Sequence, residues 1–115
     1  KGEIRILIFK RELTGGYSGY GEITENNEIN SLLETLAVKL NLIGSINVQL
    51  RINDNIPKIF EINPRFSSTV LFRHLFGFKD LEWSIKDLYA EKLGSYSLPK
   101  VGSKFYKGFN EYIKV

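Results

Sequence analysis

Four oxygen-bearing side chains stand at alternate positions in two neighbouring segments of the sequence: Asn47, Gln49, Glu61 and Asn63. Carboxylate and carboxamide oxygens are the ligands that hard divalent cations such as Mg²⁺ take in proteins, with water and phosphate oxygens completing the shell. A magnesium ion held in this way commonly arrives with a nucleotide. The spacing therefore raises the hypothesis of a metal site, provided that the four side chains reach one face of the fold.

The two segments alternate as paired strands do. Residues 46–52 place an apolar side chain at every second position with polar ones between them, and residues 58–63 resume an extended pattern. The residues at 53–57, Asn-Asp-Asn-Ile-Pro, have the composition of a turn. The sequence therefore predicts an antiparallel hairpin with one apolar and one polar face.

The apolar face selects the register. We expect Gln49 opposite Glu61 and Asn47 opposite Asn63, with an odd loop at 53–57. An even loop would pair Gln49 with Phe60 and turn polar groups toward the apolar side. The same register sets Arg51 opposite Ile59 and buries Val48, Leu50, Phe60 and Ile62. The alternative is that the four polar side chains only form the solvated face of a hairpin, although asparagine, used twice, is depleted in strands.

Gly44-Ser45-Ile46-Asn47-Val48-Gln49, followed by Ile59-Phe60-Glu61-Ile62-Asn63-Pro64-Arg65-Phe66, resembles the C-terminal half of the ATP-grasp superfamily. The likeness is greatest to the branch of the carbamoyl phosphate synthase large chain. The resemblance implies that Gln49, Glu61 and Asn63 are ligands of Mg²⁺ (or Mn²⁺) bound to ATP, with Asn47 beside the cofactor. It also implies that Arg65 is the catalytic residue, which contacts phosphate or acyl-phosphate groups.

Two further residues enter through the resemblance. Arg11, at the end of a first strand, reaches phosphate in this interpretation, and its alternative is a solvated strand end. Ser67, at the start of a helix, lies where the acceptor carboxylate or acyl phosphate binds, and its alternative is ordinary N-capping. The glycine-rich segment Gly15–Gly21 closes over the substrate or is a flexible connection.

The elements that must position these residues give an α+β fold, a mostly antiparallel sheet flanked by helices. The expected elements are a strand at 3–11, a glycine-rich loop at 13–25, a helix at 29–41 capped by Asn30 or Ser31, the hairpin, helices at 66–76 and 80–92, and a strand at 104–115. Arg73 and His74 are expected on the wet side of their helix, and Trp83 in the core with Leu81, Ile85 and Leu88.

Length and composition agree with a single domain at 1–115. The chain has 115 residues, a formal net charge of +3 and no cysteine, which excludes disulfides and thiolate metal sites and is compatible with a cytoplasmic setting. The basic residues form no run of the kind that binds nucleic acid, and no apolar stretch is long enough to cross a membrane. Phe105, Tyr106, Phe109 and Tyr112 could stack on single-stranded nucleic acid, but packing on a sheet is the favoured interpretation.

The resemblance implies the C-terminal lobe of a ligase in which ATP phosphorylates a small carboxylate, and an amine or ammonia displaces the phosphate. The lobe that holds adenine in this superfamily precedes the matched region, so we expect the 115 residues to be half of an ATP-grasp domain and inactive alone. The alternative, from another class, is a non-catalytic binding module that keeps the fold of this lobe.

Overall fold

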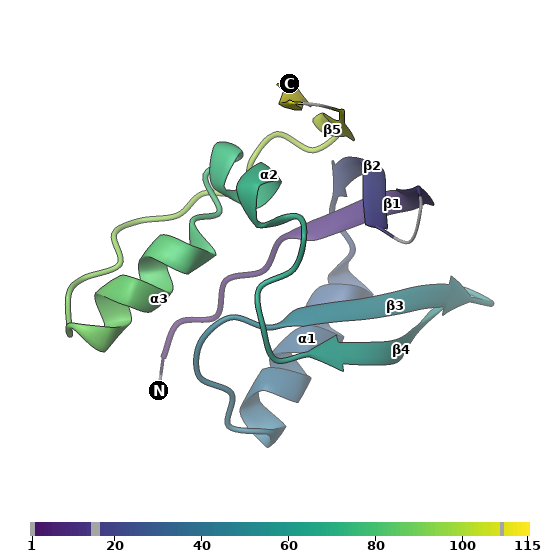
Figure 1. The fold of residues 1–115 in the computed structure, drawn as a ribbon. Helices are drawn as coiled ribbons and strands as arrows, with labels where there is room; N and C mark the ends of the chain where they lie inside the picture. Colours follow the sequence, from purple (N-terminus) through teal and green to yellow (C-terminus); the bar gives the residue numbers. More distant parts are fainter. Residues whose placement is uncertain (1, 15–16, 109) are drawn as a thin grey trace. The chain divides into compact units, whose positions relative to one another are not determined.

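The computed structural model describes residues 2–14, 17–108 and 110–115 (Figure 1). These residues form two compact units. The hairpin unit consists of the N-terminal residues up to Ile6 and of Asn26–Ser67, and the sheet unit consists of Leu7–Glu25 and Ser68–Val115. Both are built from antiparallel strands and helices, so the predicted α+β class is confirmed. In the described part of the chain, no helix is long and apolar enough to span a membrane.

The hairpin unit contains one helix, α1 (Asn27–Lys39), which lies against strand β4 (Figure 1). The helix begins after Asn26, whose extended backbone lets its side-chain oxygen accept a hydrogen bond of 3.0 Å from the Ile29 amide. This cap satisfies one of the free N–H groups of the first turn. The expected helix was therefore placed two residues late, and Asn30 and Ser31 lie inside it rather than at its cap.

Strands β3 (Asn47–Asn53) and β4 (Ile56–Asn63) form the predicted antiparallel hairpin. The turn is shorter than expected, because Asn53 pairs with Ile56 and only Asp54 and Asn55 lie between them. Both turn residues have positive φ, 52° and 61°, as a type I′ turn requires. Asparagine and aspartate tolerate this left-handed conformation better than other non-glycine residues, so the local sequence supports the tight turn.

A β-bulge at Phe60 reconciles this even turn with the predicted pairing. Gln49 pairs with Glu61, but the next residue of β3, Leu50, pairs with Ile59, so Phe60 has no partner across the strand. Arg51 consequently faces Lys58, not Ile59 as predicted. The bulge also leaves Phe60 58% exposed, so the expectation that its side chain is buried is wrong. The Ile62 side chain, at 40%, is exposed as well.

The sheet unit is a four-stranded antiparallel sheet in the order β1-β2-β5-β6. Its strands are β1 (Ile8–Thr14), β2 (Tyr17–Thr24), β5 (Lys104–Lys107) and β6 (Glu111–Lys114). The loop predicted at 13–25 is largely wrong, because residues 17–24 form β2 in spite of their glycines. Gly15 and Gly16, which belong to that expected loop, lie outside the described residues, as does Phe109.

Gly21 has a packing role in this sheet. A Cβ built on Gly21 would lie 2.2 Å from the nearest ring carbon of Phe105, which is fully buried on the neighbouring strand. Phe105 stacks on Phe72 of helix α2 (Val70–Leu75) with ring centroids 4.1 Å apart. With Ile23 and Phe76 these two aromatic residues form the buried core of the unit. A glycine that the sequence alone assigns to a loop is therefore required by close packing within the sheet.

Helix α3 (Asp80–Leu88) packs through Trp83. Its indole makes edge contacts with the rings of Phe78 and Tyr96, with centroids 5.1 and 5.4 Å away. The prediction of a buried Trp83 is confirmed, but its expected neighbours are exposed: Leu81, Ile85 and Leu88. The expected strand at 104–115 is two strands, β5 and β6. In the aromatic segment Phe105 is buried in the core, whereas Tyr106 and Tyr112 pair across these strands and are exposed.

Arg73 is buried, contrary to the expectation for its helix, while His74 is exposed as expected. The Arg73 guanidinium donates to both carboxylate oxygens of Asp80 at 3.1 and 2.9 Å, and to the Thr69 hydroxyl at 2.7 Å. All three residues are less than 9% exposed. This bidentate ion pair connects the start of α3 to α2.

Candidate functional site

The polar face of the β3–β4 hairpin brings together the four side chains that the sequence singles out. We call Asn47, Gln49, Glu61 and Asn63 the polar ladder. Gln49 pairs directly with Glu61, and Asn47 with Asn63, as predicted. Because side chains of directly opposed residues stand on the same face of an antiparallel pair, the ladder forms one continuous patch.

Hydrogen bonds join all members of the polar ladder. One carboxylate oxygen of Glu61, Oε2, accepts from the Gln49 amide and, at 3.1 Å, from the Asn63 amide. The Asn63 Nδ2 also donates to Asn47 Oδ1 at 3.3 Å. The single negative charge of the ladder is thus solvated by two side-chain N–H groups. The convergence of the four side chains on one patch is therefore present in the structure, and it depends on the register of the hairpin.

The donor set of the ladder fits a hard divalent cation. It offers one carboxylate and three carboxamide oxygens on two paired strands, and Glu61 is exposed, so water or a phosphate can reach it. Turning the terminal amide of Gln49 by half a rotation would present its oxygen where its N–H now points, at little steric cost. Within residues 2–14, 17–108 and 110–115 no cluster of three or more His, Cys, Asp or Glu side chains occurs. These residues therefore form no cation site with three or more such ligands, and the single-carboxylate site of the ladder is the candidate.

Arg65 follows the ladder by two residues. Its Nη1 donates to the backbone carbonyl of Phe66 at 3.1 Å, and the side chain is exposed. This contact holds the guanidinium near its own backbone, so an incoming anion would have to draw it away. Arg65 belongs to the same hairpin unit as the ladder.

Ser67 lies before helix α2, not at its start. The helix begins at Val70, its N-cap is Thr69, and the Thr69 side chain makes no capping bond. The expectation that Ser67 stands at the start of a helix at 66–76 is therefore wrong. The alternative of ordinary N-capping is wrong as well, because the hydroxyl of the N-cap residue, Thr69, makes no capping bond. Ser67 is half-buried.

Arg11 lies in the middle of strand β1, where it pairs with Gly21 of β2. It was expected at the end of a strand that began near residue 3, but the strand runs from Ile8 to Thr14. Arg11 is half-buried in the sheet unit, whereas the ladder belongs to the hairpin unit.

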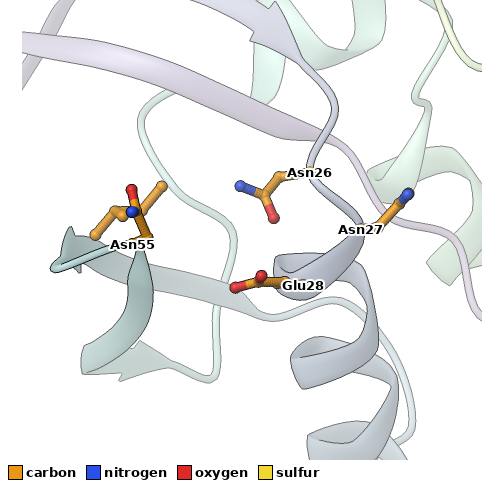
Figure 2. Close-up of a pocket in the computed structure, with 5 residues that line it drawn as sticks. Asn26, Asn27, Glu28 and Asn55 are labelled. Atoms are coloured by element: carbon orange, nitrogen blue, oxygen red, sulfur yellow. The ribbon is translucent and has the colours of Figure 1, made fainter.

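One pocket of the hairpin unit was not foreseen from the sequence. It is lined by Asn26, Asn27, Glu28, Ile52 and Asn55. Figure 2 shows Asn26 and Glu28, from the start of α1, pointing toward the hairpin turn at Asn55, while Asn27 points away. The Asn26 oxygen already accepts the capping bond of the helix, so the polar ladder remains the better candidate.

Comparison with protein-family models gives a match over residues 1–102. The family is described as ATP-grasp in the biosynthetic pathway with Ter operon. The matched range includes the polar ladder, Arg65, Ser67 and Arg11, and it ends before strand β5. Neither the curated proteins nor the solved structures compared with the chain gave a match.

Proposed function

The chain belongs to the family described as ATP-grasp in the biosynthetic pathway with Ter operon, and on that premise we propose that it is the metal-binding lobe of an ATP-dependent ligase. The reaction class is activation of a small carboxylate by ATP, followed by attack of an amine or ammonia on the acyl phosphate. The observation that carries this proposal is the polar ladder, in which Gln49, Glu61 and Asn63 share hydrogen bonds on one strand face.

In this proposal Gln49, Glu61 and Asn63 hold Mg²⁺ or Mn²⁺. A cation bound there supplies neutralisation of the charge that gathers on the phosphate oxygens of ATP during phosphoryl transfer. Asn47 orients the site, because its oxygen accepts from the Asn63 amide and fixes the direction in which that amide points. The strands add rigidity, which such positioning requires.

Arg65 is the catalytic residue of the proposal. Its guanidinium stabilises charge on the transferring phosphoryl group once it leaves the carbonyl of Phe66. Ser67, two residues further along, is proposed to donate its hydroxyl to the acceptor carboxylate. The role of Arg11 toward the phosphates of ATP stays a prediction of the family resemblance.

The finer likeness to the carbamoyl phosphate synthase branch rests on the residues of the hairpin and of the segment that follows it, Pro64-Arg65-Phe66. It favours ammonia or an amine as the nucleophile. The adenine and ribose would be held by a further lobe, as the superfamily resemblance implies. Mg-ATP and the carboxylate are accordingly the proposed partners.

Metal binding by the ladder is tested with Mn²⁺ and ¹⁵N-labelled protein. Paramagnetic broadening is expected at the amides of β3 and β4 around Gln49 and Glu61. The change Glu61→Gln removes the only charge of the ladder and keeps its shape, so the broadening should disappear while the spectrum of the folded protein persists. The matched control is Glu91→Gln, which removes an exposed carboxylate of the sheet unit and should leave the broadening intact.

The same substitution decides between an enzyme and a binding module. In the full-length protein, Glu61→Gln should abolish Mg-ATP turnover. Broadening that persists in Glu61→Gln, or that centres away from the hairpin, would remove the ladder from the mechanism. Mn²⁺ binding that depends on Glu61, in a full-length protein that turns over no ATP, would favour the non-catalytic module instead.

A further inference from the structure

The polar face of the hairpin continues beyond the ladder with two cations. Arg51 pairs directly with Lys58. Arg51 lies two positions closer to the turn than Gln49, on the same face of the hairpin. Two residues of a strand span about 6.6 Å, so the cationic pair lies roughly that far along the strands from the Gln49–Glu61 pair. Both side chains are exposed.

The bulge creates this pairing and supports it. Without the bulge, Phe60 would pair with Leu50, Arg51 would stand opposite Ile59, and Lys58 would lie on the other face of the hairpin. The bulge shifts Lys58 into register with Arg51. It also brings the Phe60 ring to the arginine, since the guanidinium carbon lies 5.7 Å from the ring centroid. A cation over an aromatic face is attracted by the ring, so the Arg51 side chain is partly ordered in advance.

Two like charges directly opposite each other destabilise a strand pair. Among the residues that the structure describes, no carboxylate forms an ion pair with Arg51 or Lys58, and Glu61 directs its carboxylate to the amides of Gln49 and Asn63. An arginine held over a ring beside a lysine is a donor set that suits the oxygens of a phosphate or carboxylate group. An anion placed between them would relieve the repulsion.

We infer that Arg51 and Lys58 form an anion subsite for the acceptor substrate, which rests on the proposed function. Along β4 and the segment that follows it, the order is Lys58, then Glu61 and Asn63 of the ladder, then Arg65, so the ladder separates two cationic positions in the sequence. The proposed function uses Arg65 for the transferring group. The Arg51–Lys58 pair is therefore left for a second anionic group of the acceptor, a phosphate or a carboxylate that is not itself activated. The substrate class is a carboxylic acid with at least one further anionic group.

The subsite is tested without metal or nucleotide, so that its failure is distinct from failure of the ladder. The ¹⁵N-labelled protein is titrated with inorganic phosphate and, separately, with citrate, and the dissociation constant is taken from the amide shifts of β3 and β4. Arg51→Gln with Lys58→Gln should weaken binding about tenfold or more, because two charge-assisted contacts are lost. Glu61→Gln should retain phosphate binding although it loses Mn²⁺.

The matched control is Lys92→Gln with Lys100→Gln, two exposed lysines of the sheet unit, which lowers the net charge equally. It should change the affinity by less than about twofold, the effect expected of long-range screened charge. The swap Arg51→Lys with Lys58→Arg keeps both charges and should keep binding, which separates loss of the subsite from damage to the hairpin.

The probes also identify the kind of anion. If the Arg51→Gln, Lys58→Gln protein loses binding of phosphate alone, the acceptor carries a phosphate group. If it loses binding of citrate alone, the acceptor is a polycarboxylate. Addition of Mg²⁺ with tripolyphosphate, which stands in for the phosphates of the nucleotide, should leave the bound probe in place, whereas displacement would overturn the assignment to the acceptor. Affinities in the Arg51→Gln, Lys58→Gln protein within about twofold of the wild type for both probes would overturn the subsite itself.

Discussion

Asp80→Ala should be among the most destabilising single changes in the sheet unit. The substitution removes the partner of the Arg73 guanidinium, which donates to both carboxylate oxygens of Asp80, at 3.1 and 2.9 Å. Arg73 is 8% exposed, so water cannot replace the lost carboxylate without opening the α2–α3 contact. Removing one member of a buried ion pair costs about 3–5 kcal/mol, because the remaining charge is left uncompensated.

That loss is large on the scale of domain stability, which is about 5–15 kcal/mol. We therefore expect the midpoint of guanidinium unfolding to fall sharply and the melting temperature to drop by more than about 10 °C. The assay is the fluorescence of Trp83, the one tryptophan of the sequence, which lies on the same helix as Asp80 and is buried.

Two further variants separate the ion pair from general damage to α3. Replacing both partners, Arg73→Met with Asp80→Leu, removes the charges together and should bring stability to within about 1 kcal/mol of the wild type. Glu82→Ala removes a partly exposed carboxylate two residues further along α3 and should leave the unfolding midpoint nearly unchanged. A loss of less than about 1 kcal/mol in Asp80→Ala would refute the reasoning, since the buried guanidinium would then have found another partner or reached water.

Three other predictions concern the core, the turn and the response to pH. Gly21→Ala should cost about 1–3 kcal/mol in chemical denaturation, because its Cβ would lie 2.2 Å from the Phe105 ring; an unchanged midpoint would mean that the core yields freely. Asn55→Gly should raise stability by about 0.5 kcal/mol in thermal melts, because glycine adopts the φ of 61° without steric cost, and a lowered melting temperature would contradict the type I′ assignment. The Lys86 ammonium, through its hydrogen bond, holds the pKa of Glu82 below its ordinary value. The pair therefore stabilises the fold above the ordinary pKa, and this stabilisation is lost as the pH falls through the lowered pKa. Glu82→Gln should make stability fall less steeply below about pH 4, and an equally steep fall in the variant would exclude the pair as a contributor.

The sequence by itself determined the polar ladder and the class of fold. Alternation along 46–52 and 58–63 is a local pattern, and the polar and apolar faces of a hairpin differ enough to select one register. The pairing of Gln49 with Glu61 followed from that difference. Helix α1 also followed, because the spacing of its apolar residues depends only on the helical period.

Only the tertiary structure decided the details that depend on residues distant in sequence. The bulge at Phe60 permits a two-residue turn together with the Gln49–Glu61 pair, a combination that alternation alone excludes. Strand β2 forms despite its glycines, because β1 and β5 pair with it on both sides and the Phe105 ring occupies the space above Gly21. The environment of Arg73 was decided by Asp80 on the next helix. In each case the free energy comes from a partner on another element, and local propensity carries no information about that partner.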